Sequence, residues 1–136
     1  MKKAVLTTTA MVGKSSKSSY YCHTTDTIEN CSLAGYGSTP KEAMDDMLVS
    51  YEEIKEINTE NGLETPALKF SYKFDLPSFF AHFKWINVSK FAEIAGINAS
   101  LLRQYVSGSA KSSDTQLSKI NNAINKLSKE LNTSIE

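Results

Sequence analysis

The segment 88–108, VSKFAEIAGINASLLRQYVSG, constrains the fold of this chain more than any other stretch. Its first apolar run ends at Gly96, and glycine tolerates the left-handed backbone with which a helix commonly ends. Ile97 fills the turn, and Asn98 can cap a second helix by accepting hydrogen bonds from free backbone N–H groups. The i, i+3, i+4 spacing of a buried helical face follows at Leu102, Tyr105 and Val106. The segment therefore predicts two short helices joined by a tight turn.

The second of these helices leaves a small polar face pointing outward. An arginine on such a face can form two hydrogen bonds with guanine, a glutamine can do the same with adenine, and small neighbours allow close approach. This combination is typical of a helix-turn-helix, which places its second helix in the major groove of DNA. Two ordinary amphipathic helices would have similar spacing, so that alternative stays open. The residues that we expect to contact DNA are Ser89, Lys90, Asn98, Ala99, Ser100, Arg103, Gln104 and Lys111.

Charge is balanced over the whole chain but divided between its halves. Residues 1–75 contain eight lysines and eleven acidic residues, a net charge of −3. Residues 76–136 contain seven basic and four acidic residues, a net charge of +3. A mildly basic C-terminal half fits contact with a polyanion, and an acidic N-terminal half indicates a separate role. Solvated surfaces alone could produce the same difference.

Residues 1–75 predict the element order β-β-β-α-β. A capping box at Thr39 and Glu42, with Pro40 in the first turn, begins a helix that ends at Asn61 and Gly62. The last strand alternates apolar residues with lysine and serine, which indicates a sheet covered on one side only. The expected strands cover residues 4–12, 20–24, 32–37 and 68–75, with a polar loop at 13–19.

Residues 76–136 predict an all-α domain around the helix-turn-helix. It would begin with an aromatic helix whose rings, including Trp85, belong to the core, with His82 at its boundary. Ser113 and Gln116 form a capping box for a closing helix. That helix carries a stripe of apolar residues, suited to a core face or a dimer seam, at Leu117, Ile120, Ile124, Leu127 and Leu131. The whole chain is thus expected to be α+β, with domains at 1–75 and 76–136.

The cysteines and the N-terminus indicate a reduced, cytoplasmic protein. Cys22 and Cys31 lack CxxC spacing and have only His23 as a nearby ligand, so we expect free thiols, no metal and no cofactor. Three consecutive threonines interrupt the apolar run after the N-terminal MKK, which argues against a signal peptide. No stretch has the apolar length of a membrane span.

Three segments together resemble the HicB family, the antitoxins of a type II toxin–antitoxin system. They are GYGSTPKEAMDDM at 35–47, KFSYKFDLPSF at 69–79 and FAEIAGINASLLRQYVSGSAKSS at 91–113. The resemblance implies a partial RNase H-like N-terminal domain that binds and blocks a HicA-type toxin, a small mRNA-cleaving protein. It also implies a C-terminal domain that binds operator double-stranded DNA and represses the operon. The segment TTDTIENCSLA at 24–34 departs from the usual Pro- and Gly-containing pattern.

The residues themselves argue against catalysis and leave one alternative function. An RNase H-type nuclease needs carboxylates converging from strand ends, whereas the first three expected strands hold none and the adjacent Asp45 and Asp46 diverge by about 100° on a helix. One helix-turn-helix buries little DNA surface, so we expect a homodimer or a higher homo-oligomer on paired half-sites. The alternative is a stand-alone regulator whose N-terminal domain senses a small molecule or protein. A toxin gene beside this one would distinguish the two.

Overall fold

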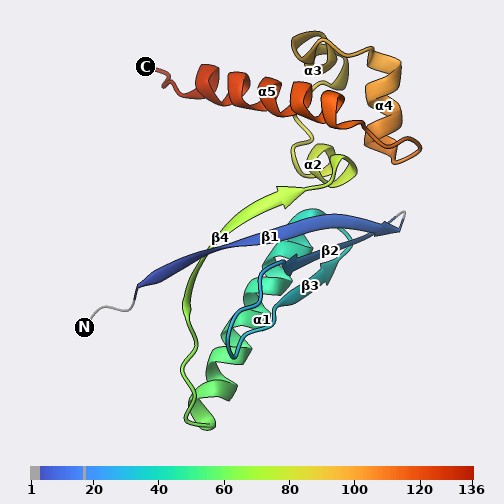
Figure 1. The fold of residues 1–136 in the computed structure, drawn as a ribbon. Helices are drawn as coiled ribbons and strands as arrows, with labels where there is room; N and C mark the ends of the chain where they lie inside the picture. The colour runs from blue at the N-terminus through green and yellow to red at the C-terminus, as the bar shows by residue number, and fades with distance from the viewer. Residues whose placement is uncertain (1–3, 17) are drawn as a thin grey trace. The chain divides into compact units, whose positions relative to one another are not determined.

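The computed structural model describes residues 4–16 and 18–136, and it is an α+β structure. The chain divides into two compact units, Met1–His82 and Phe83–Glu136 (Figure 1). The first unit contains a four-stranded sheet and two helices, and the second contains three helices. The elements are β1 (Val5–Ser16), β2 (Ser19–Thr24), β3 (Ala34–Gly37), α1 (Pro40–Glu60), β4 (Ala67–Phe74), α2 (Leu76–His82), α3 (Val88–Ala95), α4 (Ala99–Ser107) and α5 (Asp114–Leu131).

The sheet is mixed, with the strand order β3-β2-β1-β4. β1 and β2 form an antiparallel hairpin, β3 extends it, and β4 pairs in parallel with β1. Parallel neighbours need a crossover connection, which runs through α1. β1 continues to Ser16 because its last residues pair with β2, in a register that joins Gly13 to Tyr21. Most of the expected polar loop at 13–19 is therefore strand, and Lys17 lies outside the described residues.

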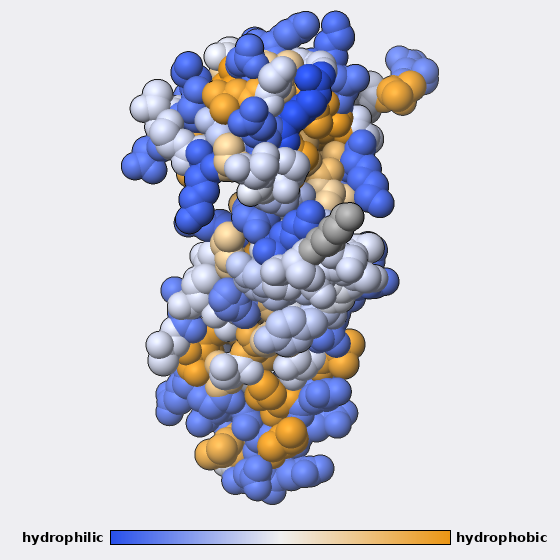
Figure 2. Space-filling view, turned by 90° about the vertical axis from the view of Figure 1, so that its right-hand side faces the viewer, coloured by the Kyte–Doolittle hydropathy of each residue, from blue (hydrophilic) through white to orange (hydrophobic). Residues whose placement is uncertain are grey.

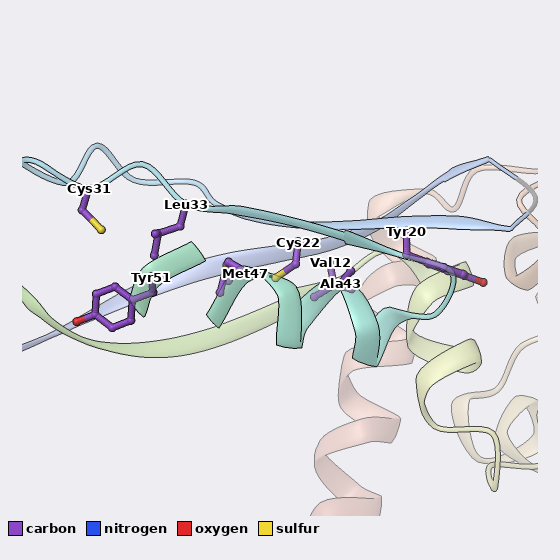
Figure 3. Packing of buried hydrophobic residues seen from close by; sticks show 9 residues of the cluster. Val12, Tyr20, Cys22, Cys31, Leu33, Ala43, Met47 and Tyr51 are labelled. Atoms are coloured by element: carbon purple, nitrogen blue, oxygen red, sulfur yellow. Dashed lines mark hydrogen bonds between the residues drawn. The ribbon is translucent and has the colours of Figure 1, made fainter. Parts of the chain in front are cut away.

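The core of the first unit lies between the sheet and α1 (Figure 3). Its buried side chains are Ala10, Val12, Tyr20, Cys22, Cys31, Leu33, Ala43, Met47 and Tyr51. Gly35 lets α1 lie directly against β3, because a Cβ there would come 2.2 Å from the backbone nitrogen of Met47. The Tyr51 hydroxyl donates to the Pro66 carbonyl (2.6 Å) and accepts from the Leu68 N–H (3.0 Å), which ties α1 to the start of β4.

The alternation expected in the last strand is confirmed in β4. Leu68, Phe70, Tyr72 and Phe74 pack against the core, whereas Lys69, Ser71 and Lys73 are exposed on the other face.

Both cysteines are free and buried, and burial raises the pKa of the Cys22 thiol to about 11. The expectation of free thiols is therefore confirmed.

We expected α2 to open the second domain, but it belongs to the first unit. It contacts β1, β4 and α1, and the rings of Phe79 and His82 pack on Phe74, with centroids 6.2 and 5.4 Å away. Asp75 fixes the join, because its carboxylate accepts from the N–H of Ser78 in α2 and from the N–H of Lys14 in β1, both at 2.8 Å. Trp85 lies beyond the end of α2 and is 69% exposed, so its assignment to the core was wrong.

No helix among the described residues has the length and apolar character needed to cross a membrane.

Candidate nucleic-acid interface

The two helices of the expected helix-turn-helix are α3 and α4, and each is capped at both ends. The Asn87 side chain accepts from the Lys90 N–H (3.0 Å) at the start of α3, which ends at Gly96 with φ of 71°. Asn98 caps α4 by accepting from the Leu101 N–H (3.1 Å), as expected. α4 ends at Gly108, with φ of 82°. Asn87 is a cap that the sequence analysis missed, although an asparagine directly before the first helical residue was an available signal.

The core of the second unit determines which face of α4 is free. Its buried side chains come from α3, the turn, α4 and α5, and they are Phe91, Ala92, Ala95, Ile97, Leu102, Tyr105, Ile120 and Ala123. With Leu102 and Tyr105 directed inward, the opposite side of α4 carries exposed Ser100, Arg103 and Gln104. This is the outward face that the sequence predicted, with Ala99 half-buried at its edge.

Arg103 links the two helices. Its guanidinium donates a 2.5 Å hydrogen bond to the hydroxyl of Ser89 in the first turn of α3. A guanidinium has five N–H donors, so this contact orients the group and leaves other donors for a ligand. The contact brings two of the expected DNA-binding residues together. Their 14-residue separation in sequence gave no local sign of it.

Two of the other expected residues are exposed lysines. Lys90 and Lys111 are exposed, and Lys90 lies 3.9 Å from the Glu93 carboxylate. An exposed pair of this kind holds a lysine only weakly, so a phosphate can compete for it. The Gln104 carbonyl accepts from the N–H groups of Ser109 and Ala110 and so closes the C-terminal end of α4. The arrangement offers cationic and amide donors around the N-terminal half of a short helix, where the helix dipole also favours anions.

The capping box of α5 forms only in part. Ser113 accepts from the Gln116 N–H (3.2 Å), but the Gln116 side-chain oxygen is buried and has no hydrogen-bond partner among the described residues. The reciprocal bond predicted from the sequence is therefore absent.

The carboxylates of α1 mostly serve local structure. Asp45 pairs with Lys41 (2.8 Å), Glu52 pairs with Lys55 (3.0 Å), and Asp46 accepts from the Tyr36 N–H of β3 (2.9 Å). Between the acidic residues of the exposed side of α1 lie three apolar ones, Leu48, Val49 and Ile57. Figure 2 shows apolar side chains among polar ones at the surface of both units. Within the described part of the chain, no three His, Cys, Asp or Glu side chains gather in a metal-binding set.

Comparisons with protein-family models, with curated proteins and with solved structures find no match for this chain.

Proposed function

We propose that the chain is an antitoxin of the HicB type, which binds operator DNA through α3 and α4 and a HicA-type toxin through its N-terminal unit. The observation that carries the DNA-binding half is the exposed face of α4, with Arg103 oriented from α3 by Ser89. The same geometry would allow α4 to enter a major groove while Lys90 and Lys111 contact phosphates. A homodimer would place two such helices on successive half-sites.

Support for the toxin-binding half comes from α1. Its exposed side combines the carboxylates of Asp45, Glu53 and Glu56 with the apolar Leu48, Val49 and Ile57. Apolar side chains set among charges of one sign suit a protein partner of opposite charge, and complementary charge speeds encounter. In this proposal the mixed sheet and α1 form the partial RNase H-like domain, and the chain inhibits an enzyme without being one.

The DNA-binding half is tested by measuring affinity for the promoter DNA upstream of this gene and for random duplex. We expect Arg103→Ala to weaken promoter binding by about 1–3 kcal/mol and to relax specificity. Lys90→Ala should weaken binding to both duplexes equally and reduce the slope of log K against log salt by about 0.9. Lys41→Ala, which removes a similarly exposed lysine from α1, is the control. Equal losses on both duplexes for Arg103→Ala would contradict base reading.

The toxin-binding half is tested with the protein encoded next to this gene. Titration of the purified neighbour into the full chain should give a complex that weakens with salt. The double variant Glu53→Lys and Glu56→Lys should bind more weakly, whereas Glu130→Lys on α5 should bind like the parent. A neighbour that neither cleaves RNA nor binds this chain would favour the stand-alone regulator.

A further inference from the structure

The sheet has a second face that no helix of its own unit covers. Both α1 and α2 pack on the side of the core, where Phe74, Phe79 and His82 also meet. The strand residues that alternate with the buried ones therefore form an open face, comprising Thr7, Thr9, Met11, Gly13, Tyr21, His23, Ala34, Tyr36, Lys69, Ser71 and Lys73. We call these residues the open sheet face.

Three aromatic rings gather at one side of the open sheet face. Tyr21 and Tyr36 are directly opposite each other on β2 and β3, and Tyr36 is 69% exposed. Tyr21 lies across β1, because a Cβ on Gly13 would come 2.2 Å from its hydroxyl oxygen. The ring of His23 meets Tyr21 edge-on at 5.2 Å. Together with Cys22, these rings border a surface hollow of about 320 Å³. The glycine thus lets a tyrosine ring lie along the sheet, where a flat ligand can stack.

The charge of the open sheet face is opposite to that of its unit. Lys69 and Lys73 are exposed on β4, and none of the eleven residues of this face is acidic. Most carboxylates of α1 lie on the other side of the core, although residues 1–75 carry a net charge of −3. Asp46 is the exception among those described, because it reaches the edge of β3 and accepts from the Tyr36 N–H (2.9 Å). Three strand spacings of about 4.8 Å separate β3 from β4, so Tyr36 and Lys73, which lie two residues apart in register, are roughly 16 Å apart across the sheet. Lys69 lies four residues further along β4, about 13 Å beyond Lys73. That span suits a short polyanion whose bases and phosphates are contacted separately.

We propose that the open sheet face binds single-stranded nucleic acid, with bases stacked on Tyr36 and Tyr21 and phosphates near Lys69 and Lys73. Stacking on a sheet requires unpaired bases, which a duplex does not offer, and exposed sheet aromatics of this kind hold two or three of them. Duplex DNA fits a helix in a groove instead. The positive charge also makes this face a poor surface for a basic toxin. The site is separate from α4 and does not depend on the function proposed for it.

The test uses the full chain and fluorescence anisotropy with labelled single-stranded RNA and DNA of about ten nucleotides. We expect Tyr36→Ala to weaken binding by about 5- to 150-fold, the range that the loss of one stacked base produces. The control is Trp85→Ala, because Trp85 has the same exposed fraction as Tyr36 and lies in the other unit. Lys69→Ala with Lys73→Ala should reduce the slope of log K against log salt by about 1.4, since each phosphate contact to a single strand contributes about 0.7. Comparing the affinities for RNA and for DNA shows whether the ribose 2′-hydroxyl contributes to binding.

Two results would overturn the proposal. One is an affinity of the parent for both strands weaker than about 10⁻⁴ M, the weak limit of non-specific binding. The other is a loss that follows Arg103→Ala and not Tyr36→Ala, since the strand would then occupy the α3–α4 surface. If single strands fail to bind while Tyr36→Ala abolishes binding of the neighbouring gene product, the open sheet face is a protein-binding surface instead.

Discussion

Glu42 joins the first turn of α1 to the loop that precedes it. Its carboxylate accepts from both the N–H (2.8 Å) and the hydroxyl (2.6 Å) of Ser38, while Thr39 accepts from the Glu42 N–H (3.1 Å). The residue types predicted a capping box between Thr39 and Glu42. The Glu42 carboxylate, however, binds the N–H of Ser38, one residue before Thr39. The hydrogen bonds from Ser38 lower the pKa of Glu42 below its usual value of 4.5.

This lowered pKa makes part of the stability depend on pH. Because the folded pKa lies below the unfolded one, the contribution of Glu42 is complete above the unfolded value near 4.5 and is lost as the pH falls through the folded value. We expect Glu42→Gln to have a lower free energy of unfolding than the parent at pH 7, with the difference shrinking under acid. Urea denaturation at several pH values measures this difference in the free energy of unfolding. Glu53→Gln, on the exposed side of the same helix, is the control, and a difference that stays constant with pH would contradict the role of Glu42.

Single side chains also mark where sequence reasoning failed. Trp85 was assigned to the core as part of an aromatic helix, yet it is the third residue beyond the end of α2, so the spacing of a helical face does not apply to it. Leu48 is an apolar residue beside the buried Met47, yet it is 39% exposed, because the residues of α1 that approach Gly35 of β3 are Ala43 and Met47. In both cases the apolar type of the residue does not by itself determine its burial.

At the scale of elements, two glycines are required for different reasons. Gly35 is required for space, because a Cβ would lie 2.2 and 2.3 Å from backbone atoms of Met47 and Ala43. Gly96 is required for its backbone angle, since its φ is 71° and no atom lies within 4 Å of an added Cβ. The first therefore controls helix-on-sheet contact, and the second controls the turn between α3 and α4.

The two requirements predict losses of different size. Gly96→Ala should lower the free energy of unfolding by about 1–2 kcal/mol, the cost of a left-handed alanine. Gly62→Ala is the matched control, because Gly62 has φ of 70° and the same free space, so it should lose a similar amount. Gly35→Ala should lose about 3 kcal/mol or more, because backbone atoms cannot rotate away from an added methyl. Urea denaturation that finds Gly35→Ala no worse than Gly62→Ala would refute this account.

Local periodicity predicted β4, α1, α3, α4 and α5, because the spacing of apolar residues within each segment defines its buried face. It did not predict that β1 extends through Gly13 to Ser16, since that extension depends on pairing with β2. The outward face of α4 followed from the spacing of Leu102, Tyr105 and Val106. The Ser89–Arg103 contact did not, because it joins separate helices. The open sheet face was foreseeable only as exposed lysines on β4, since its tyrosines come from other strands.

At the scale of the whole molecule, α5 is the surface that we propose for a homodimer. The side chains of the apolar stripe predicted from the sequence differ in their burial. Ile120 is 1% exposed within the second unit, Ile124 and Leu127 are half-buried, and Leu117 and Leu131 are 41% and 57% exposed. The stripe therefore contributes to the core through Ile120 and leaves its ends available to a second copy.

This division predicts opposite outcomes for two lysine substitutions. Leu131→Lys should remain folded but become monomeric, with weaker binding to a promoter that has half-sites about 34 Å apart. Ile120→Lys should unfold the second unit, because it buries a charge without a partner. Sedimentation and circular dichroism separate the two results. A Leu131→Lys variant that sediments like the parent would exclude this end of α5 from the dimer.

The parallel pairing of β4 with β1 also affects the order in which the two units can complete their folding during synthesis. The carboxylate that closes this part of the sheet, Asp75, reaches an N–H 61 residues earlier in the chain. During synthesis β1 and β2 can pair at once, but β1 keeps one bare edge until β4 has left the ribosome. The second unit needs only contacts between nearby helices, and such local contacts form quickly. The N-terminal half is therefore made first but waits for its last strand, whereas the helical half needs little time once it emerges.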